Sequence, residues 1–404
     1  MAQKTALCFG GTGVAGSAVV RNLKHDTDDW KIIVVSHLPK PEGLELFEDV
    51  EYVQADAFNT GAFRTKLRNY QITHLFYTAH VFKPNMNFMP ANDLGLRMVR
   101  EITSFTAKIA PYFRTLAEED FQKMFANIVG MDDGGSNLKL FTSVMDVLKD
   151  HPLEHAGIVT GGRCYGSVFM GPGLHDYVIP FREDFPRIAA DSWYYQVEDA
   201  LAELAKERGF NWSVMRPSTI IGYSEGSPFN FGTSLAVYAS LMKELGRPLV
   251  FPGMMKAYNA QIDHTSAELL ARQLIWAVRE PKAKNEAFNC VNADRARWFE
   301  VWMAIGKWFD MPIELKENGM STDAILLDAE KSGLWDDMIK KYGLRNQPLS
   351  RLAPKTTIDS FMMIDWDQPY SVDKIREAGF TETVDSAKMF CDLFQVLRDV
   401  KAIP

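Results

Sequence analysis

Three glycines near the start of the chain, Gly10, Gly13 and Gly16, have the spacing of a phosphate-binding turn. An apolar run at residues 5–9 precedes them, a helical pattern follows, and a β-branched run at 31–35 comes about 20 residues further on. Glycine permits a tight turn whose backbone approaches a pyrophosphate closely, and the start of a helix supplies oriented N–H groups. This context predicts a dinucleotide-binding turn, and an ordinary glycine-rich loop is the alternative. The residues expected to bind are Gly10, Thr12, Gly13, Val14 and Gly16.

The residues after the second expected strand indicate which dinucleotide is bound. An acidic side chain there would accept a hydrogen bond from the ribose 2′-hydroxyl and favour NAD. Residues 36–40 contain no acidic residue and offer Ser36, His37 and Lys40 instead. Hydroxyl, imidazole and ammonium groups can serve a 2′-phosphate, so NADP(H) is favoured over NAD(H), with solvated loop residues as the alternative. After the third strand, Asp56 and Ala57 are expected beside the adenine. The Asp56 carboxylate would accept a hydrogen bond from the adenine amino group or cap the following helix.

Short apolar runs and helical patterns alternate through the first half of the chain. Such alternation predicts an α/β fold with a doubly wound, Rossmann-type parallel sheet covered by helices. The expected strands are residues 5–9, 31–35, 51–54, 74–77, 156–160 and 212–215, and the expected later helices are 137–148 and 193–206. Further residues expected to contact the cofactor are Thr78, Ala79, Thr160, Pro217, Ser218 and Ile220.

The second half of the chain is mainly helical and aromatic, which predicts a smaller, mainly helical cap over the substrate. We expect an NADP-binding Rossmann domain at residues 1–224, with residues 261–292 returning to it. The substrate-binding cap would then comprise residues 225–260 and 293–404. Residues 81–135 are less regular, and their pattern leaves open whether they cover the active site or form an interface.

The composition, with 47% hydrophobic and 24% charged residues among 404, is that of an ordinary globular protein. A formal charge of −8 argues against a nucleic-acid partner, since that binding depends on dense Lys and Arg side chains. No apolar run is long enough to span a membrane, the start lacks signal-peptide features, and the four scattered cysteines indicate reduced thiols, so a cytoplasmic protein is expected. The H-x-x-x-H spacing of His151 and His155 contains Pro152 and no following glutamate, so no metal site is expected.

Several segments, taken in order, match a known pattern. They are the glycine turn and residues 52–56 (YVQAD), 73–77 (THLFY), 160–165 (TGGRCY), 183–187 (EDFPR), 193–199 (WYYQVED), 212–217 (WSVMRP), 283–289 (AKNEAFN) and 403–404 (IP). The sequence resembles the progesterone 5-beta-reductase/iridoid synthase-like family, whose members are atypical extended short-chain dehydrogenases/reductases. The resemblance covers nearly the whole chain apart from residues 81–135.

The resemblance implies an NADPH-dependent reductase of the carbon–carbon double bond of a hydrophobic enone or enal, in small-molecule or secondary metabolism. The family's catalytic tyrosine falls on Tyr194 and its lysine on Arg163, where this sequence departs from the pattern. The family's two arginines after the second strand fall on His37 and Leu38, a second departure, which weakens the preference for NADP. Ordinary short-chain dehydrogenases carry a lysine four residues after the tyrosine, and this chain has Glu198 there.

Tyr194 and Arg163 suit this chemistry physically. Hydride addition to the β-carbon of an enone pushes negative charge onto the carbonyl oxygen, which a phenol hydroxyl would stabilise. A nearby cation makes the phenol a better acid, and Arg163 is the candidate, with a salt bridge to Glu183 or Asp184 as the alternative. For Tyr194 the alternative is an aromatic packed in the core. Carbonyl reduction, alcohol oxidation, or a non-redox isomerase, cyclase or nucleotide sensor remain open as alternative functions.

The substrate is expected to be a hydrophobic small molecule in an apolar pocket with few polar groups. The residues expected to line this pocket are His80, Tyr165, Phe229, Tyr238 and Met242. His80 could also donate a proton, and packing in the core is the alternative for each of these residues. The sequence leaves open the natural substrate and the oligomeric state, with a homodimer as one option.

Overall fold

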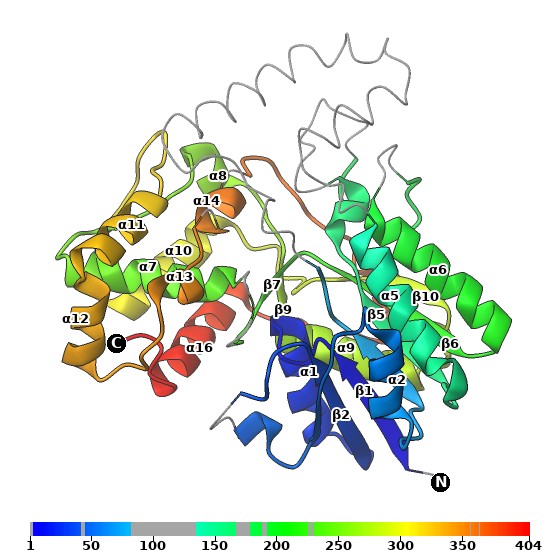
Figure 1. The fold of residues 1–404 in the computed structure, drawn as a ribbon. Helices are drawn as coiled ribbons and strands as arrows, with labels where there is room; N and C mark the ends of the chain where they lie inside the picture. The colour runs from blue at the N-terminus through cyan, green and yellow to red at the C-terminus, as the bar shows by residue number, and fades with distance from the viewer. Residues whose placement is uncertain are drawn as a thin grey trace.

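The computed structural model describes residues 3–41, 45–81, 135–166, 178–187, 192–224, 227, 230–355, 357–362 and 364–404. A parallel sheet with its covering helices forms one lobe, and a group of helices forms the other (Figure 1). The sheet has seven strands in the order β10-β6-β5-β4-β1-β2-β3. The strands are β1 (Lys4–Phe9), β2 (Trp30–Ser36), β3 (Glu51–Gln54), β4 (His74–Tyr77), β5 (His155–Val159), β6 (Asn211–Pro217) and β10 (Glu286–Cys290).

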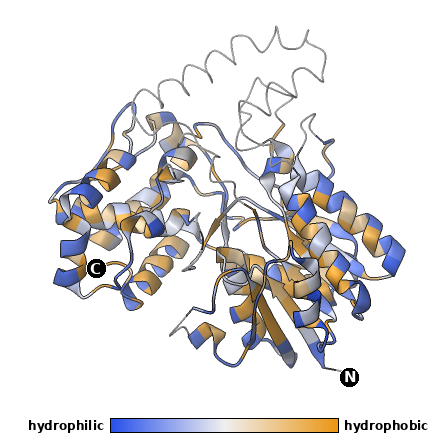
Figure 2. Cartoon of the chain, viewed as in Figure 1, coloured by the Kyte–Doolittle hydropathy of each residue, from blue (hydrophilic) through white to orange (hydrophobic). Residues whose placement is uncertain are grey.

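The central strands are apolar on both faces because helices cover both sides of the sheet. Leu7 of β1 pairs in parallel with Ile33 of β2 and with Leu75 of β4, and all three side chains are buried. Such continuous apolar runs are typical of buried parallel strands, and Figure 2 shows the sheet as the most hydrophobic part of its lobe. The strand order contains the 3-2-1-4-5-6 arrangement of a dinucleotide-binding fold, so the expected Rossmann-type sheet is confirmed.

Helices pack on the two faces of this sheet. Helices α1 (Val14–Lys24) and α9 (Ala267–Arg279) contact each other, whereas α5 (Ser136–Val147) contacts both α2 (Thr60–Leu67) and α6 (Trp193–Arg208) on the other side (Figure 1). Four short 3-10 helices are described in this lobe: η1 (Glu45–Phe47), η2 (Leu148–Asp150), η3 (Gly162–Tyr165) and η4 (Pro281–Ala283). The expected strands and helices of this lobe are therefore present, with ends that shift by a few residues.

The second lobe is built mainly from helices. They are α7 (Phe231–Glu244), α8 (Met255–Asn259), α10 (Trp298–Phe309), α11 (Asp323–Ser332), α12 (Leu334–Tyr342), α13 (Leu349–Leu352), α14 (Thr357–Met362) and α16 (Ser386–Asp399). Two small parallel sheets accompany them: β7 (Thr219–Ile221) with β9 (His264–Ser266), and β8 (Leu249–Val250) with β11 (Ile313–Glu314).

Two clusters of buried apolar side chains correspond to the two lobes. The sheet cluster includes Tyr370, Val372, Ile375, Ala378 and Phe380, because α15 (Asp373–Ala378) packs against β10. We therefore propose that residues 370–380 belong with the sheet, although the sequence pattern placed all of 293–404 in the cap.

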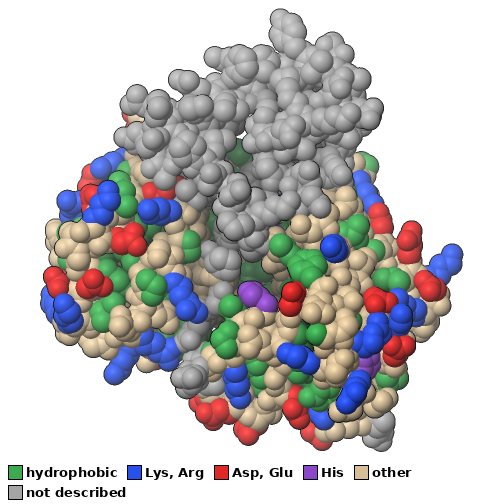
Figure 3. Space-filling model, viewed as in Figure 1, with side chains coloured by type: hydrophobic (Ala, Val, Ile, Leu, Met, Phe, Trp, Pro, Cys, Tyr) green, Lys and Arg blue, Asp and Glu red, His purple; other side chains and the backbone are tan. Residues whose placement is uncertain are grey.

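The surface charges and the cysteines are further features of the structure. Positive and negative side chains are interspersed on the face drawn in Figure 3. Within the described ranges, no helix combines the length and apolar character needed to cross a membrane. Cys8, Cys164 and Cys290 are buried free thiols and Cys391 is partly buried, which confirms the expectation of unpaired, mostly buried cysteines.

Candidate active site

The glycine turn joins β1 to α1 and has the geometry that a pyrophosphate requires. Gly10 has a φ of +86°, and a Cβ on Gly16 would lie 2.2 Å from the carbonyl oxygen of Gly10, so a side chain is excluded there. Helix α1 begins after Gly13 with no side-chain cap and no acidic residue in its first turn. The positive end of the helix is thus left for an anion, and a dinucleotide pyrophosphate fits this cradle.

The segment after β4 lies against the glycine turn, as expected for neighbours at the point where the strand order reverses. The Thr78 hydroxyl donates to the carbonyl oxygens of Phe9 at 3.1 Å and Gly10 at 3.3 Å. A Cβ on Gly10 would meet the backbone nitrogen of Ala79 at 2.8 Å. From the other side, the Ser224 hydroxyl donates to the Thr12 carbonyl at 2.8 Å. The fold therefore brings the expected cofactor residues of the first and fourth strands together.

The loop after β2 is held by hydrogen bonds to its backbone. The hydroxyls of Thr12 and Ser36 lie 3.0 Å apart, and the Ser36 hydroxyl accepts the amide of Leu38 at 3.2 Å. From β3, the Gln54 amide donates to the His37 carbonyl at 3.1 Å, while the side chains of His37 and Lys40 are exposed. An imidazole and an ammonium group are therefore presented to solvent beside the glycine turn.

Asp56 follows β3 and is exposed, and Ala57 beside it is buried. The Asp56 carboxylate accepts the amide of Phe58 at 2.9 Å. Helix α2 is capped by Asn59, whose side chain accepts the amide of Ala62. The alternative that Asp56 caps this helix is therefore wrong, because the chain makes one further turn before α2 begins.

Tyr194 lies near the start of α6, where the hydroxyl of Ser192 accepts its amide at 3.4 Å. Its side chain is 8% exposed. A Cβ on Gly161, just after β5, would lie 3.3 Å from the Tyr194 hydroxyl and 3.4 Å from the carbonyl oxygen of Pro217 at the end of β6. The phenol hydroxyl therefore sits at the carboxyl edge of the parallel sheet, where ligands of this architecture bind.

Ring contacts connect this phenol to Trp193 and, through Trp193, to His80. The Trp193 ring meets the Tyr194 ring edge-on, with centroids 4.0 Å apart, and the His80 ring lies 5.0 Å from the Trp193 ring. His80, Trp193 and Tyr194 thus form one aromatic group. Sequence reasoning had singled out His80 and Tyr194 but not Trp193, since an aromatic beside a tyrosine gives no signal of its own.

The electrostatics of this group keep both titratable side chains neutral at pH 7. Burial raises the pKa of Tyr194 above its ordinary value, and the charge of Arg163 partly opposes that rise. Burial lowers the pKa of His80 to about 3, and Arg163 adds to the effect. The phenol is therefore a hydrogen-bond donor rather than a phenolate base.

Arg163 lies in η3 and is partly buried. The two carboxylates considered as its salt-bridge partners bind other groups. Asp184 accepts two hydrogen bonds from Arg182, at 2.9 and 2.8 Å, and Glu183 accepts the amide of Asn289 at 2.7 Å. The charge of Arg163 acts on the site through its effect on the pKa values of Tyr194 and His80.

A buried ion pair stands one turn further along α6. The Glu198 carboxylate binds the Arg216 guanidinium of β6 through two hydrogen bonds, at 2.6 and 3.1 Å. The Thr160 hydroxyl donates to the same carboxylate at 2.8 Å. Sequence reasoning noted Glu198 only as the residue that replaces a lysine. The i,i+4 spacing places Glu198 on the face of Tyr194, but nothing in the sequence pairs it with residue 216.

The residues expected to line the substrate pocket do not gather at one place. The Tyr165 hydroxyl donates to Asn289 at 2.7 Å, and its ring stacks on Phe181. Tyr238 and Met242 belong to the core of the helical lobe, where the Tyr238 hydroxyl donates to the Val250 carbonyl. Because α7 is buried along most of its length, these two side chains pack inside the lobe, in a different cluster from Tyr194. Phe229 lies outside the described residues.

Comparison with known proteins identifies the family. The model of the PRISE-like Rossmann-fold domain matches residues 110–404. The chain belongs to the PRISE-like Rossmann-fold family. It is 30% identical over 414 residues to an (S)-8-oxocitronellyl enol synthase of Antirrhinum majus, covering 100% of this chain and 93% of that one. It is also 28% identical over 412 residues to a 3-oxo-Delta(4,5)-steroid 5-beta-reductase of Arabidopsis thaliana, covering 100% of this chain and 94% of that one.

Solved structures agree with the PRISE-like fold. An epimerase of Methanothermobacter thermautotrophicus has a TM-score of 0.62 at 16% identity, covering 99% of this chain and 94% of that chain. A UDP-glucose-4-epimerase of Stenotrophomonas maltophila with bound NAD has a TM-score of 0.60 at 13% identity, covering 99% of both chains. The resemblance seen in the sequence is thereby confirmed, as is the class, an NAD(P)-dependent oxidoreductase of the short-chain dehydrogenase/reductase type.

Proposed function

We propose that this protein reduces the carbon–carbon double bond of a hydrophobic enone or enal with NADPH. The observation that carries the proposal is the buried, neutral Tyr194 hydroxyl beside Gly161 at the carboxyl edge of the sheet. The relatives named enol synthase and steroid 5-beta-reductase support it, because both names describe small apolar molecules that carry oxygen.

The described residues suit a nicotinamide dinucleotide. The turn from Gly10 to Gly16 would hold the pyrophosphate at the start of α1, with Thr78 and Ala79 alongside. We propose NADP because residues 36–40 after β2 offer Ser36, His37 and Lys40 to a 2′-substituent, with no acidic residue among these five. When bound, the cofactor supplies a hydride. The side chains of Pro217, Ser218 and Ile220 would border it at the ends of β6 and β7.

The protein's own residues stabilise the charge that the reaction creates. The Tyr194 phenol donates a hydrogen bond to the carbonyl oxygen as negative charge develops on it, in a site from which burial excludes water. Arg163 strengthens this donor by favouring loss of the phenol proton. Neutral His80 and the Trp193 ring supply an apolar wall with one polar edge.

The test is turnover of NADPH with a panel of enones and the matching saturated ketones, with the products identified. We expect saturation of the double bond by the wild-type protein, and a loss of about a hundredfold or more in turnover in Tyr194→Phe, because removing one such donor costs about 3–4 kcal/mol. NADPH affinity should change little, since the hydroxyl acts mainly in the transition state. A product alcohol in place of a saturated carbonyl compound would assign carbonyl reduction.

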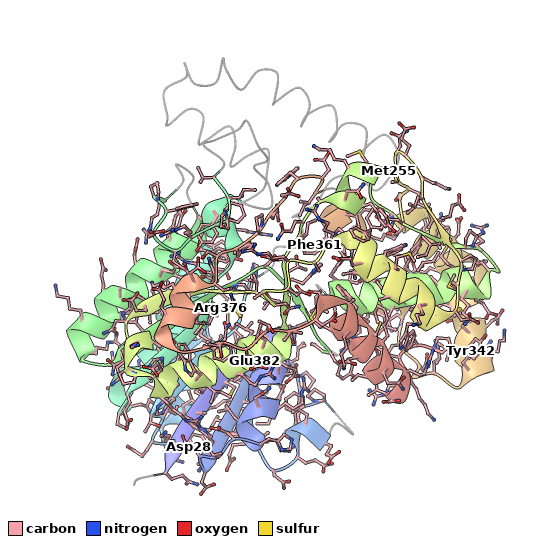
Figure 4. All side chains as sticks on the ribbon, turned by 180° about the vertical axis from the view of Figure 1, so that it is seen from behind. Asp28, Met255, Tyr342, Phe361, Arg376 and Glu382 are labelled. Carbon is pink, nitrogen blue, oxygen red and sulfur yellow. The ribbon has the colours of Figure 1, made fainter. Side chains whose placement is uncertain are left out.

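The matched control is Tyr342→Phe. Tyr342 ends α12 at the outer edge of the helical lobe, seen from behind in Figure 4, and its hydroxyl donates to Glu244 at 2.7 Å. The same atom is removed far from the sheet, so turnover should stay at the wild-type level. Equal activity of the two variants would refute the role of Tyr194, and absence of any NADPH-dependent product would refute the proposed function.

A further inference from the structure

We propose that the buried Glu198–Arg216 pair is the positioning device that holds the Tyr194 hydroxyl at the reacting carbonyl. The proposal rests on the proposed function, since it takes Tyr194 as the hydrogen-bond donor. Glu198 and Arg216 are positioning residues here, because they act through Tyr194 and its neighbours.

The pair is deeply buried and joined by two hydrogen bonds. The Arg216 guanidinium binds both carboxylate oxygens of Glu198, and the two side chains are only 11% and 7% exposed. A planar guanidinium that binds both oxygens of a carboxylate, like the two prongs of a fork, fixes the relative orientation of the two groups as well as the distance between them. Tyr194 lies one helical turn before Glu198 on the same face of α6, so the fork fixes how that face sits on the sheet.

The pair also joins the segments that surround the phenol. The Thr160 hydroxyl of the β5 end donates to Glu198, and the Cys164 thiol of η3 lies 3.7 Å from the same oxygen. Arg216 donates to the Tyr165 hydroxyl at 3.3 Å, and Tyr165 in turn donates to Asn289 of β10 at 2.7 Å. Four elements of the site edge, β5, η3, β6 and β10, are therefore tied to α6.

The residues next to Thr160, Cys164 and Arg216 in the sequence are groups that surround Tyr194. Gly161 follows Thr160, Arg163 precedes Cys164, and Pro217 follows Arg216. A Cβ on Gly161 would already crowd the Tyr194 hydroxyl at 3.3 Å, so a small displacement of these segments would move the donor relative to its surroundings.

A buried ion pair is weak evidence for a role in stability. Two charges lose their hydration when they are buried, and apolar residues of similar volume often stabilise a protein as well or better. The two hydrogen bonds of the pair and its place at the active-site edge support a positioning role.

The pair also sets the charge seen by the phenol. The titratable groups that act on Tyr194 are Arg163, Cys164 and Glu198, and His80 stands across the Trp193 ring. With the carboxylate present, the charge of Arg216 is compensated at close range. Neutralising Glu198 would remove the negative charge that raises the pKa of Tyr194 and leave the charge of Arg163 acting on the phenol.

The experiment uses Glu198→Gln, with Glu203→Gln on the exposed face of the same helix as the matched control. The phenol of residue 194 is titrated by ultraviolet difference absorbance against the corresponding Tyr194→Phe protein, which needs no substrate. In Glu198→Gln we expect the pKa of Tyr194 to fall, because the carboxylate charge that raises it is removed. We also expect turnover to fall by at least about tenfold, since small misplacements of catalytic groups are costly, with NADPH affinity unchanged.

A pKa and a turnover that match those of Glu203→Gln would overturn the proposal. Should Glu198→Gln fail to fold, Arg216→Lys keeps both charges and loses only the fork. That variant should show an unchanged pKa of Tyr194 with reduced turnover, and wild-type turnover would overturn the proposal. If the wild-type protein reduced no enone, the proposed function would fall, but the phenol titration would still decide whether Glu198 controls Tyr194.

Discussion

Replacing Asp263 by asparagine should make the protein more stable at alkaline pH. Asp263 lies just before β9 and is 1% exposed. One carboxylate oxygen accepts the amide of Tyr370 at 2.8 Å, while the other has no hydrogen-bond partner among the residues that the structure describes. Burial raises the pKa of Asp263 to about 7, although the Tyr370 amide works in the opposite direction.

The size of the effect follows from this pKa. An aspartate in the unfolded chain titrates near 3.9, and about three pKa units at 1.36 kcal/mol each give about 4 kcal/mol. Between about pH 4 and pH 7 the folded state binds more protons than the unfolded chain, so the free energy of unfolding falls as the pH rises. The cost is fully present above about pH 7 and absent below about pH 4. From pH 5 to pH 8 the wild-type protein should lose roughly 2.5 kcal/mol relative to Asp263→Asn.

Urea denaturation at several pH values between 5 and 8 measures this difference directly. Asparagine keeps an oxygen that can accept the Tyr370 amide, so the substitution removes the charge and little else. Asp328→Asn, at an exposed position of α11, is the matched control and should follow the wild-type pH dependence. If the free energies of unfolding of wild type and Asp263→Asn ran parallel across this range, the carboxylate would not be buried as described.

Substitutions at two positions test the site. Arg163→Met should raise the pKa of Tyr194 further and slow turnover, whereas Arg163→Lys should preserve both, because it is the positive charge that opposes the effect of burial on the phenol. Phenol titration and steady-state kinetics measure these effects, and equal behaviour of the two variants would contradict the prediction. Gly16→Ala should abolish dinucleotide binding, measured calorimetrically, because its Cβ would lie 2.2 Å from the Gly10 carbonyl oxygen, whereas Gly61→Ala meets nothing within 4 Å and should bind normally. Normal binding by Gly16→Ala would show that the turn is not the site.

The elements that position the site could be read from local pattern. The runs at 51–54 and 74–77 are strands with those bounds, and the glycine spacing led to the turn between β1 and α1. These predictions succeed because burial on both faces leaves a continuous apolar run in the sequence itself. Tyr194 was found through the resemblance to a family rather than through its own context, since a buried aromatic is common.

The helical lobe was less predictable. Tyr238 and Met242 were expected at the substrate, but α7 is buried almost all round, so the periodicity that would tell a pocket face from a core face is missing. Residues 293–404 were expected in the cap as a whole, whereas α15 packs on β10, and we propose that residues 370–380 belong with the sheet. Which element a helix packs against depends on the path by which the chain returns to the sheet, and the local sequence pattern does not indicate that path.

The amino-acid order by itself determined the strands, the glycine turn and the absence of a lysine four residues after Tyr194. Each of these depends only on residues that are close together in the sequence. Only the tertiary structure decided that Glu198 binds Arg216 and that the Trp193 ring contacts the rings of both His80 and Tyr194. It also decided that Asp263 is buried with one oxygen that has no partner among the described residues. The charge state and direction of these side chains depend on water exclusion and on partners from distant strands, and both arise when the sheet and the helices pack together.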